Sequence, residues 1–165
     1  MVRSRAVCAT LAVALLGSAG WGYWSGRHAA NTFSATVVQA IDGDTIDVQF
    51  AGRVERIRLL GADTPEVKDP HKPVQCYGPE ASAYTHAHLV AGMRVRLETD
   101  VEPRDKYGRL LAYVYVNGKR YEDELLRLGL AHLLIIPPNG EHARAMLKAE
   151  LEARAAGRGL WSACP

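Results

Sequence analysis

Three acids and two arginines of this 165-residue chain stand beside predicted turns and strand ends, at Asp44, Asp63 and Glu66 and at Arg58 and Arg109. Carboxylates are the ligands that hard cations such as calcium and magnesium prefer. Guanidinium groups bind phosphate oxygens in a bidentate way that an ammonium group does not match. A metal ion, a carboxylate acting on water and paired arginines meet the needs of phosphodiester hydrolysis. The set therefore favours a metal-dependent phosphodiesterase.

The candidate metal ligands are Asp44 and Asp63. Each lies at a predicted strand end next to turn residues, where a carboxylate can face a shared point without interrupting a β-ladder. The backbone carbonyl of Thr64 is a third candidate oxygen. The alternative for Asp44 is a solvated hairpin turn, the commoner role of an isolated Asp-Gly-Asp sequence.

Glu66 is the candidate general base. It follows Asp63 by three positions, and Pro65 restricts the chain between them, so its carboxylate can lie near the metal without binding it. Arg58 and Arg109 lie on two predicted strands and are expected to converge on one phosphate. The alternative for each of these residues is an ordinary loop or surface charge.

Lys106, Tyr107 and Lys72 are secondary candidates for binding a substrate. The first two directly precede the Gly-Arg step at position 109, and Lys72 lies in a proline-rich loop. The alternative for the lysines is a charge that only aids solubility. We expect no catalytic histidine, because His86 and His88 are two positions apart on a predicted helix and do not share a face.

Charge excludes one class of nucleic-acid protein. The formal net charge is +2, but Arg3, Arg5 and Arg27 precede every acid, and the rest of the chain carries 17 Lys and Arg against 18 Asp and Glu. A polycationic coat is therefore excluded, and polyanion binding must come from a local cluster of cations. With 48% hydrophobic and 23% charged residues, the composition indicates a single globular domain.

Residues 1–30 have the layout of a secretory signal. Arg3 and Arg5 precede an apolar run at 6–16, and small residues follow at 17–20. The apolar character continues to Trp24, so the alternative is an uncleaved signal anchor. Both interpretations predict an exported domain, either secreted or periplasmic, or held at the membrane by this segment.

The exported part contains a single pair of cysteines, Cys76 and Cys164. An even pair in an oxidising compartment favours a disulfide. Closing so long a loop would add about 3 to 5 kcal/mol of stability. The alternative is two free thiols.

The pattern of the remaining chain predicts an α+β, mainly β domain at 35–165 after a short linker at 31–34. Alternation of apolar residues predicts strands at 36–38, 45–50, 54–60, 94–99 and 110–116. Helices are predicted after Gly78, at 123–128 and at 141–156. Five strands with about three helices indicate a five-stranded OB-fold β-barrel.

Helical periodicity also predicts which helix faces are buried. In the first helix, Ala83, Ala87 and Val90 fall on one stripe. In the last helix, the residues predicted to face the core are Ala145, Leu151 and Ala155.

Six short motifs occur in an order and spacing that resemble the staphylococcal nuclease, or thermonuclease, family. They are IDGDT at 41–45, RLLGADTPE at 58–66, YGPEAS at 77–82, DKYGR at 105–109, GLA at 129–131 and GLW at 159–161. The resemblance extends from about residue 35 to residue 161, which is nearly all of the predicted domain.

The resemblance implies an OB-fold nuclease that binds Ca²⁺ through Asp44, Asp63 and the carbonyl of Thr64. It implies that Glu66 is the base and that Arg58 and Arg109 clamp the phosphate. It further implies endonuclease action on single-stranded DNA and on RNA, with 5′ P–O cleavage leaving 3′-phosphates. We expect a monomer that contacts a membrane only if the N-terminal segment is uncleaved.

Two features depart from the family's best-studied member. That protein has pocket tyrosines after the GLA motif, whereas this chain has mostly aliphatic residues at 132–138. Loss of a stacking surface predicts weaker substrate binding, by ~1 to 3 kcal/mol per base. The cysteine pair is also foreign to that member. The alternative function is a catalytically weak domain that only binds nucleic acid, but all five acids and arginines are present, which favours the enzyme.

Overall fold

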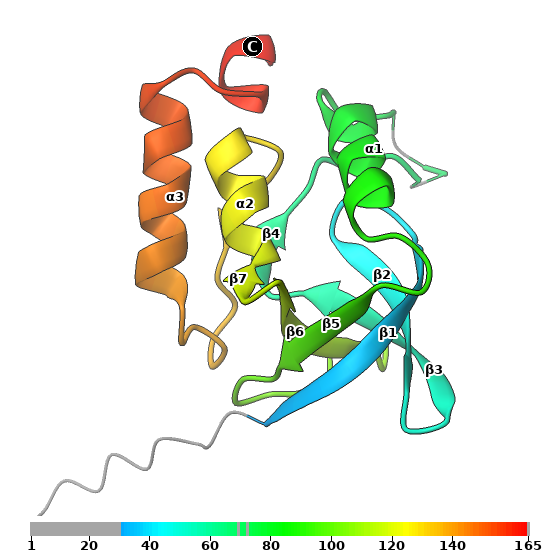
Figure 1. The fold of residues 1–165 in the computed structure, drawn as a ribbon. Coiled ribbons are helices and arrows are strands. Elements are labelled where there is room, and N and C mark those ends of the chain that lie inside the picture. The colour runs from blue at the N-terminus through cyan, green and yellow to red at the C-terminus, as the bar shows by residue number, and fades with distance from the viewer. Residues whose placement is uncertain (1–30, 69, 72, 165) are drawn as a thin grey trace, which may run out of the picture.

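Five strands form a closed barrel in the computed structural model, which describes residues 31–68, 70–71 and 73–164 (Figure 1). They are β1 (Thr32–Ala40), β2 (Thr45–Phe50), β3 (Arg53–Leu59), β5 (Arg94–Glu98) and β6 (Leu110–Val116). Neighbouring strands are antiparallel in the order β3-β2-β1-β5-β6, and a parallel pairing of β3 with β6 closes the barrel. The predicted OB-fold barrel is confirmed.

Along β2 and β3, apolar side chains that point into the barrel alternate with side chains that point out of it. Ile46 and Val48 of β2 and Ile57 of β3 are fully buried. Because successive strand residues point to opposite faces, Arg58 points away from the core between Ile57 and Leu59. Burial of each large aliphatic side chain contributes about 1.5 to 3 kcal/mol. The core packing of β3 therefore fixes the direction of Arg58.

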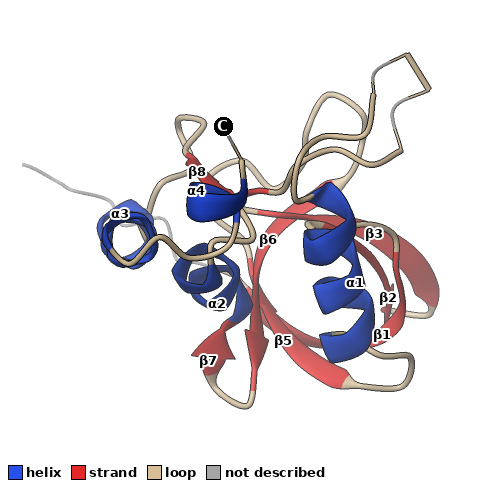
Figure 2. Cartoon of the chain, turned by 90° about the horizontal axis from the view of Figure 1, so that it is seen from above, coloured by secondary structure: helices blue, strands red, loops and turns tan. Residues whose placement is uncertain are grey.

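The remaining elements surround the barrel. The helices are α1 (Gly78–His88), α2 (Tyr121–Leu128), α3 (Ala143–Ala155) and α4 (Leu160–Ala163). The short strands β4 (Gly61–Asp63) and β8 (His132–Leu134) pair with each other, and β7 (Lys119–Arg120) pairs antiparallel with β6. Seen from above, α1 lies over the ring of strands, and α2 and α3 pack together beside it (Figure 2). Within the described residues, no helix is both long and apolar enough to cross a membrane.

The N-terminal strand is longer than predicted. Thr32–Ser34 were assigned to a linker, but they pair with β5, and Phe33 lies opposite Leu97. The Phe33 ring is 4.1 Å from the ring of Phe50, between centroids. Pairing with β5 thus extends β1 to Thr32, and the aromatic contact packs this end of β1 against β2.

The predicted buried faces of two helices are wrong. Ala83 and Ala87 of α1 and Val90, just after the helix, are exposed, whereas Ala81 and Thr85 are buried. The helix buries a polar threonine, which a search for apolar residues does not count.

In α3, Ala145, Leu151 and Ala155 are likewise exposed. The buried residues of that helix are Met146, Ala149, Glu150 and Ala153. Because this helix carries alanine on several faces, apolar identity alone does not indicate which face is buried.

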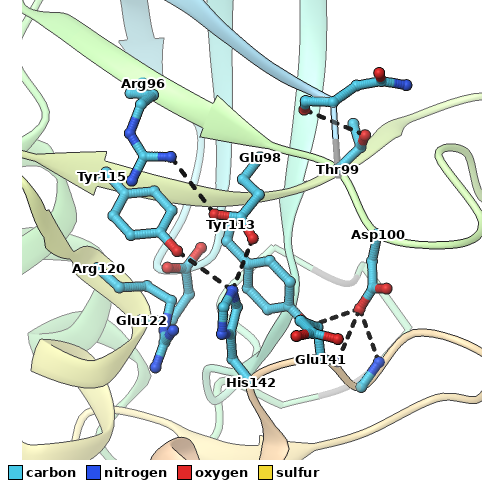
Figure 3. Close-up of polar contacts among 12 residues, drawn as sticks. Arg96, Glu98, Thr99, Asp100, Tyr113, Tyr115, Arg120, Glu122, Glu141 and His142 are labelled. Carbon is cyan, nitrogen blue, oxygen red and sulfur yellow. Dashed lines mark hydrogen bonds and ion pairs between the residues drawn. The ribbon is translucent and has the colours of Figure 1, made fainter. Parts of the chain in front are cut away.

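Polar contacts join the barrel to the segment that enters α3 (Figure 3). The Asp100 carboxylate accepts hydrogen bonds from the Tyr113 hydroxyl, at 3.0 Å, and from the backbone N–H groups of residues 140–141, at 2.8 and 3.0 Å. His142 Nε2 lies 2.9 Å from Glu98 Oε1. These contacts hold the chain before α3 against β5 and β6.

The two predicted partner cysteines are joined. Cys76 and Cys164 form a disulfide with their Cα atoms 5.8 Å apart, across 88 positions of sequence. The bond connects the segment before α1 to the end of α4.

Candidate active site

Asp44 is the buried centre of the acidic cluster. It ends the turn between β1 and β2, and its Oδ2 accepts hydrogen bonds from the Thr64 N–H at 2.8 Å and the Thr64 hydroxyl at 3.0 Å. The Thr45 hydroxyl donates to Asp44 Oδ1 at 3.2 Å. Burial raises the pKa of Asp44 to about 6, although the charge of Arg58 acts in the opposite direction. The structure thus brings Asp44 and Thr64 into direct contact.

Arg58 bridges the two predicted metal ligands. Its Nη1 lies 3.1 Å from Asp44 Oδ2, and its Nη2 lies 2.6 Å from Asp63 Oδ1. Nη1 also donates to the carbonyl of Ala62 at 2.7 Å. Pairing of Thr45 with Arg58 in the ladder of β2 and β3 sets this arrangement. Asp44, Asp63 and Arg58 therefore form one cluster.

The turn that carries Asp44 needs a glycine at position 43. A Cβ atom on Gly43 would lie 2.6 Å from Thr64 Oγ1, which is closer than such atoms approach. The backbone of this turn is therefore free to pack directly against the segment that follows β4. This close approach explains how two motifs some twenty positions apart build one site.

Arg109 is held by Asp105, an acid for which no role was predicted. Its Nε donates to Asp105 Oδ2 at 2.7 Å, while Asp105 Oδ1 accepts the backbone N–H groups of Tyr107 and Arg109, both at 2.9 Å. Asp105 opens the DKYGR motif, and a carboxylate that caps the following turn is a common role for that position. Asp105 thus fixes both the turn and the guanidinium of Arg109.

Both arginines line one cleft of about 760 Å³. Lys106 and Tyr107 also line it, and the Tyr107 ring is 72% exposed. Apart from Tyr107 and Tyr113, the large apolar side chains of the wall are aliphatic: Leu59, Leu60, Leu111, Leu134, Ile135 and Ile136. The structure therefore brings together the four cleft residues that the sequence predicted, and it places aliphatic residues beside them.

Glu66 lies on the loop that follows Thr64. It is not among the described residues that line the cleft. Its Oε1 accepts the N–H groups of Val67 at 2.8 Å and Lys68 at 2.6 Å. The Lys68 ammonium donates to the carbonyl of Ile41, which ties the loop to the hairpin that carries Asp44. Lys72 is outside the described residues.

The candidate metal ligands are of the kind that a hard cation prefers, but there are few of them. Among the described residues, no group of three or more His, Cys, Asp or Glu side chains could hold a metal ion. A metal ion here would be held by Asp44, Asp63, the Thr64 carbonyl and water. The two carboxylates contact the same guanidinium, that of Arg58, so both lie beside one side chain. All donors are oxygen, as calcium requires, so the residues fit the ion.

Known proteins resemble this chain over most of its length. The model of the family described as "Staphylococcal nuclease homologue" matches residues 56–163. A thermonuclease of Staphylococcus intermedius is 44% identical over 128 residues, which cover 78% of this chain and 76% of that protein. A thermonuclease of Staphylococcus hyicus is 38% identical over 138 residues, covering 84% and 81%. Endonuclease YncB of Bacillus subtilis (strain 168) is 43% identical over 131 residues, covering 78% and 62%.

A closed five-stranded barrel with paired arginines in one cleft, and two acids bound to one of them, defines an OB-fold nuclease. The chain belongs to the staphylococcal nuclease family. It is a hydrolase of phosphodiester bonds, as the acids and arginines predicted.

Proposed function

We propose that the protein is a calcium-dependent endonuclease that cleaves the 5′ P–O bond of DNA and RNA and leaves 3′-phosphates. The observation that carries the proposal is the convergence of Arg58 and Arg109 on one cleft, with Asp44 and Asp63 bound to Arg58. Relatives named thermonuclease and endonuclease support it.

Each residue has a distinct role in the proposed reaction. Asp44, Asp63 and the Thr64 carbonyl would hold calcium, which would supply positive charge next to the scissile phosphate. Glu66 takes a proton from water, and the water oxygen bonds to phosphorus as the bond to the 5′ oxygen breaks. The guanidinium groups stabilise the negative charge that gathers on the phosphoryl oxygens.

Lys106, Tyr107 and Lys72 are proposed to bind the substrate strand. Lys106 and Tyr107 line the same cleft as the two arginines. The aliphatic wall at 134–136 offers a base contact area without an aromatic ring for stacking, which weakens binding rather than chemistry.

We propose that the domain is exported and acts as a monomer. The disulfide supports an oxidising compartment. Residues 1–30, the predicted signal peptide or anchor, lie outside the described residues. Fractionation of cells separates the two fates: activity in the medium or periplasm indicates cleavage, and activity retained in washed membranes indicates an anchor.

Hydrolysis of heat-denatured DNA and of RNA by the purified protein tests the proposal. We expect acid-soluble nucleotides with Ca²⁺, none with excess chelator, and 3′-phosphate ends on the products. Glu66→Gln should reduce turnover by about 100-fold or more while the fold stays intact, because it removes the base. No release by a folded wild-type protein would favour a domain that only binds nucleic acid, and full activity of Glu66→Gln would exclude Glu66 as the base.

A further inference from the structure

Gln75 forms hydrogen bonds with both the N–H and the carbonyl of Glu66. The Glu66 N–H donates to Gln75 Oε1 at 2.8 Å, and the Gln75 N–H donates to the Glu66 carbonyl at 2.9 Å. The two bonds close the loop between these residues into a ring. No other described residue donates to or accepts from these two backbone groups of Glu66.

The direction of the Glu66 carboxylate depends on that backbone. Its Oε1 is held by the N–H groups of Val67 and Lys68, so the carboxylate turns with the chain at 66–68. The Lys68 ammonium donates to the carbonyl of Ile41 and forms no hydrogen bond with the backbone of Glu66. The bonds from Gln75 are therefore the direct restraint on the predicted base.

The residue after Gln75 is covalently anchored. Cys76 is joined to Cys164, 88 positions later, so the end of the loop is fastened to the end of α4. A cavity of about 550 Å³ lies beside the bond and is lined by Pro65, Gln75 and both cysteines. A small reductant can therefore reach the disulfide from solvent.

The start of α1 leaves little room for the loop to shift. A Cβ atom on Gly78 would lie 2.7 Å from Val67 Cγ1 and 2.9 Å from the Pro65 carbonyl oxygen. The residues on either side of Glu66, Pro65 and Val67, therefore pack closely against the start of α1.

We infer that Gln75 is a positioning residue for Glu66 and that the disulfide between Cys76 and Cys164 anchors it. The inference rests on the proposed function, in which Glu66 is the base. It predicts that reduction of the disulfide lowers turnover in a protein that remains folded.

Paired variants of Gln75 separate positioning from stability. Gln75→Met keeps the length of the side chain but removes the acceptor, and we expect kcat to fall about 10- to 100-fold with KM unchanged. Gln75→Glu keeps an acceptor oxygen and should retain most of kcat. Gln49→Met, on the exposed side of β2, is the matched control.

Wild-type kcat in Gln75→Met would overturn the role of Gln75. A Gln75→Glu variant that loses activity as fully as Gln75→Met would do the same.

The anchor is tested by reducing the full-length protein and by the double variant Cys76→Ser, Cys164→Ser. Both should lower kcat. Adding Gln75→Met to the double variant should reduce kcat by a smaller factor than it does in the wild type, because Gln75 and the disulfide act as a unit. Unchanged kcat in the folded, reduced enzyme would overturn the anchoring role.

Amide hydrogen exchange at residues 66–68 keeps this inference distinct from the proposed function. Exchange there should be faster in Gln75→Met and in the reduced protein, whether or not the protein cleaves nucleic acid. A wild-type protein without activity would refute the proposed function alone. Unchanged exchange in both altered forms would refute the restraint on the loop.

Discussion

The hydroxyl group of Thr85 donates a hydrogen bond of 2.8 Å to the carbonyl oxygen of Gly43, 42 positions earlier in the chain. Thr85 in turn accepts a bond of 3.1 Å from the hydroxyl of Tyr121, and all three residues are buried. This chain of bonds connects α2 and α1 to the turn that presents Asp44. Helix packing thereby sets the position of a predicted calcium ligand.

Thr85→Val should weaken both the fold and the calcium site. It leaves the Gly43 carbonyl without its donor, which costs about 1 to 3 kcal/mol of unfolding free energy. The freed turn should also raise the half-saturating calcium concentration for hydrolysis several-fold. Urea unfolding and calcium titration measure the two effects, with Thr85→Ser as the control that keeps the hydroxyl. Equal calcium dependence in the valine and serine variants would show that this bond does not position Asp44.

The bidentate geometry of Arg58 should matter more than its charge. Arg58→Ala removes a guanidinium that contacts both acids and lines the cleft, and we expect kcat to fall by about 100-fold or more. Arg58→Lys restores one positive charge but not the planar pair of donors, so it should recover only a small part of the loss. Steady-state kinetics on denatured DNA measure both variants. Full recovery by lysine would reduce Arg58 to a general electrostatic role.

Glu122 should make the protein less stable as pH rises. It is fully buried, its Oε1 accepts the Val114 N–H at 2.8 Å, and its Oε2 has no partner among the described residues. Burial raises the pKa of Glu122 from 4.5 to about 8. Because the folded state holds the proton more tightly, this contribution to stability is complete below pH 4.5 and is lost as pH rises to about 8.

Glu122→Gln should remove that pH dependence, because the amide oxygen still accepts the Val114 N–H and does not titrate. The wild type should lose stability by up to about 1.4 kcal/mol per pH unit in this range, relative to the variant. Urea unfolding at several pH values measures the difference, with the exposed Glu80→Gln as control. Parallel pH profiles for the wild type and Glu122→Gln would contradict the raised pKa.

The aliphatic cleft wall should limit substrate affinity. Ile136 is 64% exposed and lines the cleft, so Ile136→Tyr offers a ring on which a base can stack. We expect KM for single-stranded DNA to fall about 5- to 100-fold with little change in kcat. Leu151→Tyr on the exposed face of α3 is the control for a tyrosine elsewhere on the surface. Unchanged KM in Ile136→Tyr would show that the wall does not contact the substrate.

Local sequence patterns predicted the barrel because strand alternation reflects burial directly, as at Ile46 and Val48. The cluster of Asp44, Asp63 and Arg58 was predictable for a related reason, since each lies at a strand end or on a strand that the barrel aligns.

Long-range partners were not predictable in this way. The bonds of Gln75 to Glu66 and of Thr85 to Gly43 depend on packing between segments, and neither residue belongs to a local pattern. Asp105 was missed because its role is to hold Arg109 rather than to contact a ligand directly.

Calcium dependence of Asp63→Asn tests the central claim, that these acids hold the ion on which hydrolysis depends. The variant removes a half-exposed carboxylate charge, and we expect its half-saturating calcium concentration to rise at least about 10-fold. Asp47→Asn is the control, because that acid lies on β2, close in sequence to Asp44, but pairs with Arg56, at 2.8 Å. We predict that Asp47→Asn has a half-saturating calcium concentration close to that of the wild type. We predict that Asp63→Asn needs a much higher calcium concentration. Hydrolysis by Asp63→Asn with wild-type calcium dependence, or by the wild type in excess chelator, would contradict the account.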